Sequence, residues 1–448
     1  MSLPRLSRRR ILQSLLGVPL VAAASQPARS AARVEEVPGP RGIRAYLLRE
    51  PSIPFISLSF HFEGGAAQDP QGKEGLAHMA SGLLDEGAGP YDSKAFRRAL
   101  EDNAIRLSFE ADRDGFSGEL KTLHETRPLA FELLRLALEE PRFDEEPVTR
   151  IREQILADLR RRESDPNYIS ARRWFAHAFE GHPYARPTRG TPESISRITV
   201  EDLRRFRRSK LARGNLHIGV AGDITAEELA PLLDSAFGGL PAEPELVPVA
   251  DVEPRSGGVL LGRMPIPQSV VTFGHGGIER HDPDYYAAYV ANYVLGGGGF
   301  SSRLTEEIRE KRGLAYSVYS YLYDARHAPL WLGGVATRND QVAKSIELVR
   351  QEVARLAESG VSEKELEDAK TYLTGSFPLR LTSNDRIARI LVAMSVQKLG
   401  RDYLEKRNGY IEAVTLEDVR RVSQRLFAQP ILFSVVGDPE GLEATVTE

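Results

Sequence analysis

Thr199-Val200-Glu201-Asp202-Leu203-Arg204-Arg205-Phe206 recurs as Thr415-Leu416-Glu417-Asp418-Val419-Arg420-Arg421-Val422, 216 residues further along the chain. Each copy begins with a threonine suited to cap a helix and is followed by a short β-branched strand ending in Gly-Asp, at 220–223 and 435–438. A weaker match links residues 83–87 to 293–297. Three matches in the same order at nearly constant offset indicate a duplicated unit of about 200 residues.

The order of predicted elements within each half indicates the fold class. Residues 53–62 and 259–273 have the composition of opening strands, and residues 128–138 and 145–162 show helical periodicity. Scattered strands and grouped helices predict an α+β fold, in which each half is a mostly antiparallel sheet with helices packed on one face. Between the halves, four spaced prolines indicate a semi-rigid linker; they are Pro241, Pro244, Pro248 and Pro254. We therefore assign residues 31–240 to one domain, 241–257 to the linker and 258–448 to a second domain.

Composition excludes several classes of function. The 448 residues are 41% hydrophobic and 27% charged, which is typical of a globular protein. There is no cysteine, so disulfides, thiolate metal sites and cysteine nucleophiles are excluded. The net charge of −4 gives no indication of nucleic-acid binding.

Residues 1–30 resemble an export signal. Ser7-Arg8-Arg9-Arg10-Ile11-Leu12-Gln13 precedes a short apolar run and then small residues, as in secretory signals. The paired arginines resemble a twin-arginine signal, which predicts a periplasmic protein with no membrane attachment after cleavage. The alternative is a disordered basic tail.

Several motifs, in this order, resemble the insulinase-like (pitrilysin) metallopeptidases, also called inverzincins. They are the stretches 64–70 and 73–82 around His78, Arg-Arg-Arg-Glu-Ser-Asp-Pro at 160–166, His-Pro-Tyr-Ala-Arg-Pro at 182–187, and Glu-Lys-Arg-Gly-Leu-Ala-Tyr-Ser at 310–317. The resemblance covers essentially the whole mature chain. It implies two homologous halves in a clamshell arrangement.

The catalytic motif of that family, H-x-x-E-H, is broken here. His78 keeps the first position, but Ser81 replaces the general base and Gly82 replaces the second histidine. The distal ligand position falls at Asp158. A catalytic zinc needs about three protein ligands, so we expect no metal in this degenerate site and no catalytic residue in this chain alone. Ordinary structural roles, including an ion pair for Asp158, are the alternative.

The second half keeps a pair of groups that the family uses to hold substrate. By resemblance, Arg309 and Tyr316 would reach toward the peptide and the zinc-bound reaction centre, and both offer hydrogen-bond donors. Arg312 is the competing arginine. The alternative is that Arg309 pairs with a local acid and Tyr316 only packs on its strand.

A run of four glycines precedes this pair. Gly296, Gly297, Gly298 and Gly299 resemble the substrate-handling loop in the non-catalytic subunit of the mitochondrial processing peptidase. The same run is equally compatible with a tight turn passing close to neighbouring backbone.

Together these features predict a non-catalytic, substrate-binding subunit of a heterodimeric periplasmic zinc peptidase. The homologous partner would carry an intact H-x-x-E-H and the zinc, and the substrate would be an extended peptide or unfolded polypeptide. One alternative is a structural or peptide-binding protein without proteolytic role, like the core subunits of respiratory complex III. Another is an independent hydrolase with unrecognised metal ligands.

Overall fold

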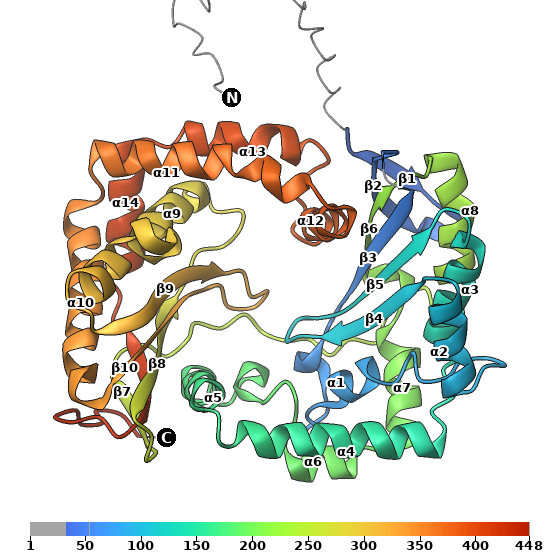
Figure 1. Ribbon diagram of the computed structural model, residues 1–448, viewed down its shortest axis with the longest axis horizontal. Coiled ribbons are helices and arrows are strands. Elements are labelled where there is room, and N and C mark those ends of the chain that lie inside the picture. Colours follow the sequence, from blue (N-terminus) through green and yellow to red (C-terminus); the bar gives the residue numbers. More distant parts are fainter. Residues whose placement is uncertain (1–32, 53, 448) are drawn as a thin grey trace, which may run out of the picture. The chain divides into compact units, whose positions relative to one another are not determined.

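The computed structural model describes residues 33–52 and 54–447, of which Val34 onward form one compact unit (Figure 1). The predicted signal segment, 1–30, lies outside the described residues. The strands are β1 Glu35–Pro38, β2 Arg44–Arg49, β3 Phe55–Glu63, β4 Arg106–Ala111, β5 Gly115–Leu123, β6 Leu216–Gly222, β7 Val259–Arg263, β8 Gln268–Gly276, β9 Ala315–Tyr323, β10 Leu330–Arg338 and β11 Leu432–Gly437. The α-helices are α1 Leu76–Ser81, α2 Ser93–Asp102, α3 Arg127–Glu139, α4 Glu145–Arg162, α5 Pro166–Ala178, α6 Pro192–Arg197, α7 Val200–Lys210, α8 Ala226–Phe237, α9 Tyr285–Asn292, α10 Val342–Ser359, α11 Glu363–Gly375, α12 Asn384–Val396, α13 Tyr403–Glu412 and α14 Leu416–Phe427.

The strands form two sheets with the same topology, which confirms the α+β fold. The first sheet has the order β1-β2-β6-β3-β5-β4 and the second β7-β11-β8-β10-β9. In each sheet one parallel pair, β2 with β6 or β7 with β11, continues into three antiparallel pairings. Only β1 has no counterpart among the described strands of the second sheet.

The repeated sequence forms equivalent helix starts in the two halves. Thr199 caps α7 by accepting a hydrogen bond from the backbone of Asp202, whose carboxylate accepts one from the backbone of Thr199 in return. Thr415 and Asp418 form the same reciprocal pair at the start of α14. Such capping boxes satisfy donors that a helix N-terminus otherwise leaves free. The predicted threonine caps are therefore confirmed.

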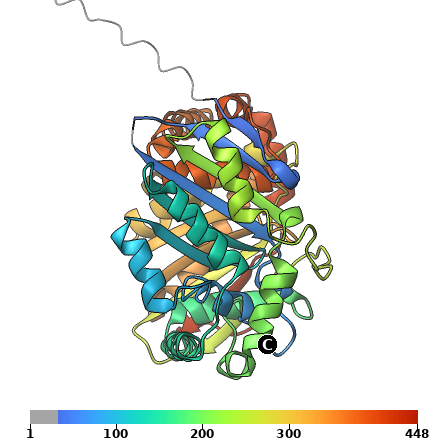
Figure 2. The ribbon, with the colours of Figure 1, turned by 90° about the vertical axis from the view of Figure 1, so that its right-hand side faces the viewer.

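Each sheet has its own helices on one face and a helix from the other half on the opposite face. Figure 2 shows α2, α3 and α8 over the outer face of the first sheet. On its other face lies α12, so close that a Cβ at Gly219 of β6 would be 2.4 Å from the carbonyl oxygen of Ala388. In β11 of the second sheet, Phe433 packs with the helices of its own half, whereas Leu432 packs with Trp174 of α5. Side chains alternate between faces along a strand, so adjacent residues contact different halves.

Two details differ from the sequence prediction. The predicted single strand 259–273 is two strands, β7 and β8, because Pro265 and Pro267 interrupt the ladder between them. β1 and β2, which precede the first predicted strand, were not anticipated. The segment 241–257 contains neither helix nor strand. Within the described part of the chain, no helix combines the length and apolar character needed to span a bilayer.

Candidate functional site

Two of the sequence motifs hold the start of α1, the helix that carries His78. The Asp69 carboxylate is buried and accepts hydrogen bonds from the backbone N–H groups of Gly75 and Ala77, at 2.8 and 3.0 Å. Arg186, from the His-Pro-Tyr-Ala-Arg-Pro stretch, donates to the carbonyl oxygens of Asp69 and Ala67, at 2.7 and 2.9 Å. Hydrogen bonds to the Asp69 carboxylate and from Arg186 thus hold the backbone at the start of the degenerate motif.

A guanidinium group lies between the two remaining candidate ligands. Arg189 Nη1 is 3.3 Å from Nε2 of His78 and 3.9 Å from Oδ2 of Asp158. Burial, followed by the charge of Arg189, lowers the pKa of His78 to about 4, so the ring is neutral and accepts from the guanidinium. Asp158 also pairs with Arg161 and Arg162 of its own helix, and these cations hold its pKa below the usual value despite burial. Asp158 is thus engaged in ion pairs with arginines of its own helix.

The remaining positions of the motif supply no metal ligand. The hydroxyl of Ser81 is directed back to its own helix, where it donates to the His78 carbonyl oxygen at 2.8 Å. Gly82 ends α1 and has no side chain. Among the described residues, no group of three or more histidine or carboxylate side chains is placed to hold a metal ion. The site does not fit zinc, because one imidazole and one carboxylate with a fixed cation nearby are a poor ligand set.

Sequence reasoning missed Arg189. The residue lies two positions after the quoted motif 182–187, so its neighbourhood was recognised. No spacing rule relates it to His78, which lies 111 residues away in the chain. Only the fold brings the two together.

Arg309 and Tyr316 lie together at the start of β9. Arg309 belongs to a π-helical turn, Thr305–Glu310, and its guanidinium stacks over the rings of Phe300 and Tyr316, at 4.6 and 5.1 Å. Its Nε is 3.3 Å from a carboxylate oxygen of Glu310. Tyr316 is 84% exposed and Phe300 69% exposed. The cluster is an open cationic and aromatic surface rather than a buried one.

The competing arginine is engaged elsewhere. Nη1 of Arg312 donates to the backbone oxygen and to the carboxylate of Glu307, at 2.7 and 2.6 Å. By contrast, the terminal nitrogens of Arg309 make no hydrogen bond to the described residues. Arg309 is therefore the arginine with free donors at this surface.

The four glycines are not equivalent. Gly296 is buried, and a Cβ there would lie 2.4 Å from Oγ of Ser320 and 2.7 Å from its backbone nitrogen, so close packing with β9 requires glycine. Gly299 has a φ of +58° and open space around it. Gly297 is also exposed, and Gly298 is half-buried. The first glycine thus has a packing role, while the end of the run is accessible.

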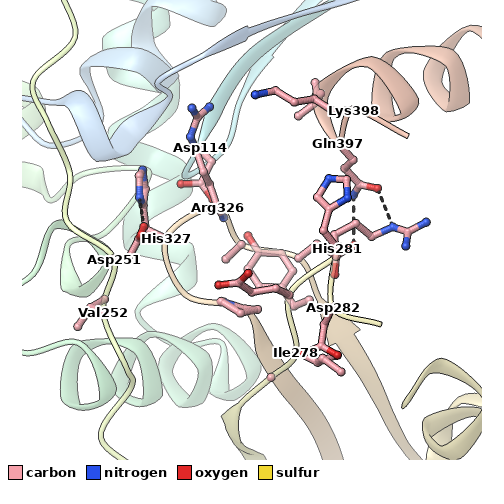
Figure 3. A pocket seen from close by; sticks show the side chains of 18 of the residues that line it. Asp114, Asp251, Val252, Ile278, His281, Asp282, Arg326, His327, Gln397 and Lys398 are labelled. Atoms are coloured by element: carbon pink, nitrogen blue, oxygen red, sulfur yellow. Dashed lines mark hydrogen bonds and ion pairs between the residues drawn. The ribbon is translucent and has the colours of Figure 1, made fainter. Parts of the chain in front are cut away.

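Both halves line a cavity of about 980 Å³ (Figure 3). Arg326 lies across it: its guanidinium pairs with Glu63 of β3 at 2.7 Å, and its backbone N–H donates a hydrogen bond to a carboxylate oxygen of Asp114 at 3.0 Å. Hydrogen bonds from His217 and from Arg326 lower the pKa of Glu63 to about 2. Tyr184, from the motif at 182–187, donates to Asp114 at 2.5 Å. The cavity is strongly polar, and neither the Arg309–Tyr316 pair nor the degenerate site is part of its lining.

Comparisons with known proteins agree with this geometry. Residues 44–192 match the family Insulinase (Peptidase family M16), and residues 197–373 match the Peptidase M16 inactive domain. The non-peptidase homologue YmxG of Helicobacter pylori is 30% identical over 73% of this chain and 76% of its own length.

Solved structures share the fold over nearly the whole chain. A peptidase M16 inactive domain from Pseudomonas fluorescens superposes with a TM-score of 0.86 at 28% identity, covering 92% of this chain and all (100%) of that one. A chain of complex III2 from Candida albicans has a TM-score of 0.77 at 18% identity, over 92% of this chain and 97% of its own, and so shares the fold alone. Its zinc ligands are replaced, and a guanidinium lies beside the one remaining imidazole. The chain therefore belongs to the insulinase family of peptidases, M16, as an inactive member.

Proposed function

We propose that this chain is the non-catalytic, substrate-binding subunit of a heterodimeric zinc peptidase. The partner is a homologous chain with an intact H-x-x-E-H, which supplies the zinc and the general base. The observation that carries the proposal is an asymmetry between the halves. Arg189 lies between His78 and Asp158, whereas Tyr316 is exposed and the half-buried Arg309 keeps its terminal nitrogens free of hydrogen bonds to the described residues.

Arg309 and Tyr316 supply the hydrogen-bond donors that such a subunit needs. A guanidinium and a phenol can donate hydrogen bonds to a peptide carbonyl and to the oxyanion that forms when hydroxide attacks it. Stacking of Arg309 on Phe300 and Tyr316 restricts the guanidinium without occupying its terminal nitrogens. In the proposed heterodimer these donors act at the partner's zinc site.

The surface beside the pair suits an extended polypeptide. β9 is the edge strand of its sheet, so one side of its backbone has no neighbouring strand among the described residues. Tyr319 and Tyr321 of β9 are 50% and 43% exposed and stack on each other. An extended peptide can add to such an edge through backbone hydrogen bonds while aromatic side chains contact its side chains. Unfolded segments are therefore the proposed substrates.

The proposed site of action is the periplasm. The support is the twin-arginine-like order of residues 7–13, which is typical of export as a folded protein.

Peptidase assays of the purified mature chain, of a homologue that retains H-x-x-E-H, and of the two together test the proposal. We expect chelator-sensitive cleavage of an unfolded polypeptide only by the mixture. Arg309→Ala in the mixture should lower kcat/KM by about 10²–10³-fold, the usual effect of removing an oxyanion donor. Arg312→Ala is the matched control and should leave cleavage unchanged, because Arg312 is bound to Glu307.

Two outcomes would contradict the proposal in different ways. If Arg309→Ala left cleavage by the complex unchanged, a structural role would be favoured, as the fold shared with a complex III2 chain allows. Cleavage by the lone chain that a chelator abolishes would instead identify an independent hydrolase.

A further inference from the structure

A small pocket in the second half is rich in arginine and contains no carboxylate. It measures about 220 Å³ and lies among α9, α12, α13 and the 3₁₀ turn Phe377–Leu381. Its lining includes three arginines, Arg280, Arg380 and Arg407, but no aspartate or glutamate. The pocket lies away from both the degenerate zinc site and the Arg309–Tyr316 surface, whose residues do not line it.

The hydrogen-bond partners of Arg280 within the described part of the chain are all neutral. Its Nη2 donates to the hydroxyls of Tyr286 and Tyr403 at 3.0 and 3.2 Å, and its Nε donates to the side-chain oxygen of Gln397 at 3.2 Å. Its guanidinium also lies 4.1 Å from the ring centroid of Tyr285. Aromatic and amide partners satisfy the hydrogen-bonding geometry of a guanidinium, but the negative charge that acts on Arg280, that of Asp324, does so without a direct ion pair.

The carboxylate of Asp324, which belongs to the same hydrogen-bond network, accepts hydrogen bonds from groups other than Arg280. Asp324 accepts hydrogen bonds from the hydroxyl of Tyr285 and from the amide nitrogen of Gln397, both at 3.2 Å. Among the described residues no ion pair joins it to Arg280. Asp324 lines the neighbouring cavity between the halves and not this pocket.

Arg407 also has only neutral hydrogen-bond partners among the described residues, and unlike the half-buried Arg280 it is buried. It is 6% exposed, and its Nη1 donates to the carbonyl oxygen of Leu373 and to Oδ1 of Asn408, both at 2.9 Å. Its guanidinium lies 4.2 Å from the ring centroid of Phe377. Elsewhere in this half, buried Arg303 is neutralised by Glu365 through two hydrogen bonds of 2.7 and 2.8 Å. No carboxylate of residues 33–52 or 54–447 pairs in this way with Arg280 or Arg407, and this distinguishes the pocket.

The third arginine is available to a ligand, and the remaining lining combines four tyrosines and a glutamine with apolar side chains. Arg380 is exposed and makes no hydrogen bond or ion pair with the described residues. The apolar part of the pocket lining includes Ile390, Met394 and Leu399. Because an arginine remains protonated at any physiological pH, a buried guanidinium without a counter-ion favours an anion from outside the chain.

We propose that this pocket binds a carboxylate attached to a small apolar body. The carboxylate lies against the guanidinium groups and the apolar body against Ile390 and Met394. A dry cavity of about 150 Å³ accommodates benzene, so a volume of about 220 Å³ suits roughly ten heavy atoms. The ligand is either a free acid or the C-terminal residue of a peptide, two sources that share this chemistry.

Calorimetric titration of the full-length mature protein tests the proposal. The probes are octanoate and 3-phenylpropionate as free acids, and N-acetyl-phenylalanine as the mimic of a peptide C-terminus. The matched neutral controls are octan-1-ol, 3-phenylpropionamide and N-acetyl-phenylalanine amide. We expect at least one carboxylate to bind about tenfold or more tightly than its neutral analogue, and the probe that binds best identifies the source.

Substitutions locate the binding. Arg380→Gln should weaken carboxylate binding by about tenfold and leave folding intact, because the side chain is exposed. Arg420→Gln, at an exposed position of α14 outside the pocket, is the control and should have no effect. Equal binding of acids and neutral analogues, binding insensitive to Arg380→Gln, or no binding of any acid at about 10 mM would overturn the proposal.

Discussion

Replacement of Arg189 by glutamine tests whether a guanidinium has taken over the cation position of the degenerate site. The substitution removes the charge and the 3.3 Å hydrogen bond to His78, and it weakens the 3.9 Å pairing with Asp158. A hydrogen bond from a charged donor contributes about 1.5–3 kcal/mol, and this one is long and its arginine is 38% exposed. We therefore expect a loss of about 1 kcal/mol in the free energy of unfolding at pH 7.5.

The dependence on pH separates this role from simple packing. His78 has a pKa of about 4 in the native protein, against 6.5 for an ordinary histidine. As the pH falls below 6.5, the unfolded chain takes up a proton that the native site refuses, so native stability decreases by up to about 1.4 kcal/mol per pH unit. Without the Arg189 charge the pKa of His78 should rise partway, since burial remains. The variant should thus lose less stability than wild type between pH 6.5 and 4.5.

Urea unfolding at several pH values and an NMR titration of the His78 ring measure both effects. Arg161→Gln is the matched control, because Arg161 pairs with the same Asp158 yet makes no contact with the imidazole. If wild type and Arg189→Gln had parallel pH profiles and the same His78 pKa, the guanidinium would not be a functional substitute for a metal cation.

Three further changes have defined outcomes. Ser81→Glu and Gly82→His together restore the motif, and we expect them to give stoichiometric zinc binding only when combined with Arg189→Gln. Metal analysis after dialysis measures this. A side chain at position 82 is tolerated, because the atom nearest to a Cβ there would be 3.4 Å away. Trp174→Ala should reduce the free energy of unfolding by about 3–5 kcal/mol, because this fully buried ring joins α5 to the second sheet, and a smaller loss in chemical denaturation would refute that role. Gly296→Ala should cost about 1–3 kcal/mol by overpacking, whereas the same change at an exposed glycine of the run would cost less.

The chain's sequence by itself determined the duplication and the replacement of the H-x-x-E-H residues at 81 and 82. The repeated threonine caps and Gly-Asp strand ends are local signals, because capping and strand propensity depend on residues a few positions apart. Likewise, the neutral hydroxyl of Ser81 is a poor general base in any fold, and Gly82 has no side chain to act as a zinc ligand. The prediction of a single strand at 259–273 was wrong, because Pro265 and Pro267 interrupt the strand despite the apolar composition around them.

Only the tertiary structure decided which groups replace the lost ones and how the halves are joined. Helical periodicity shows that α5 and α12 each have an apolar face, but it carries no information on which sheet covers that face. The contact between Arg189 and His78 and the shared pocket of Arg280 and Arg407 likewise join residues far apart in the chain. Electrostatic interactions depend on distance in space, and the fold alone sets that distance.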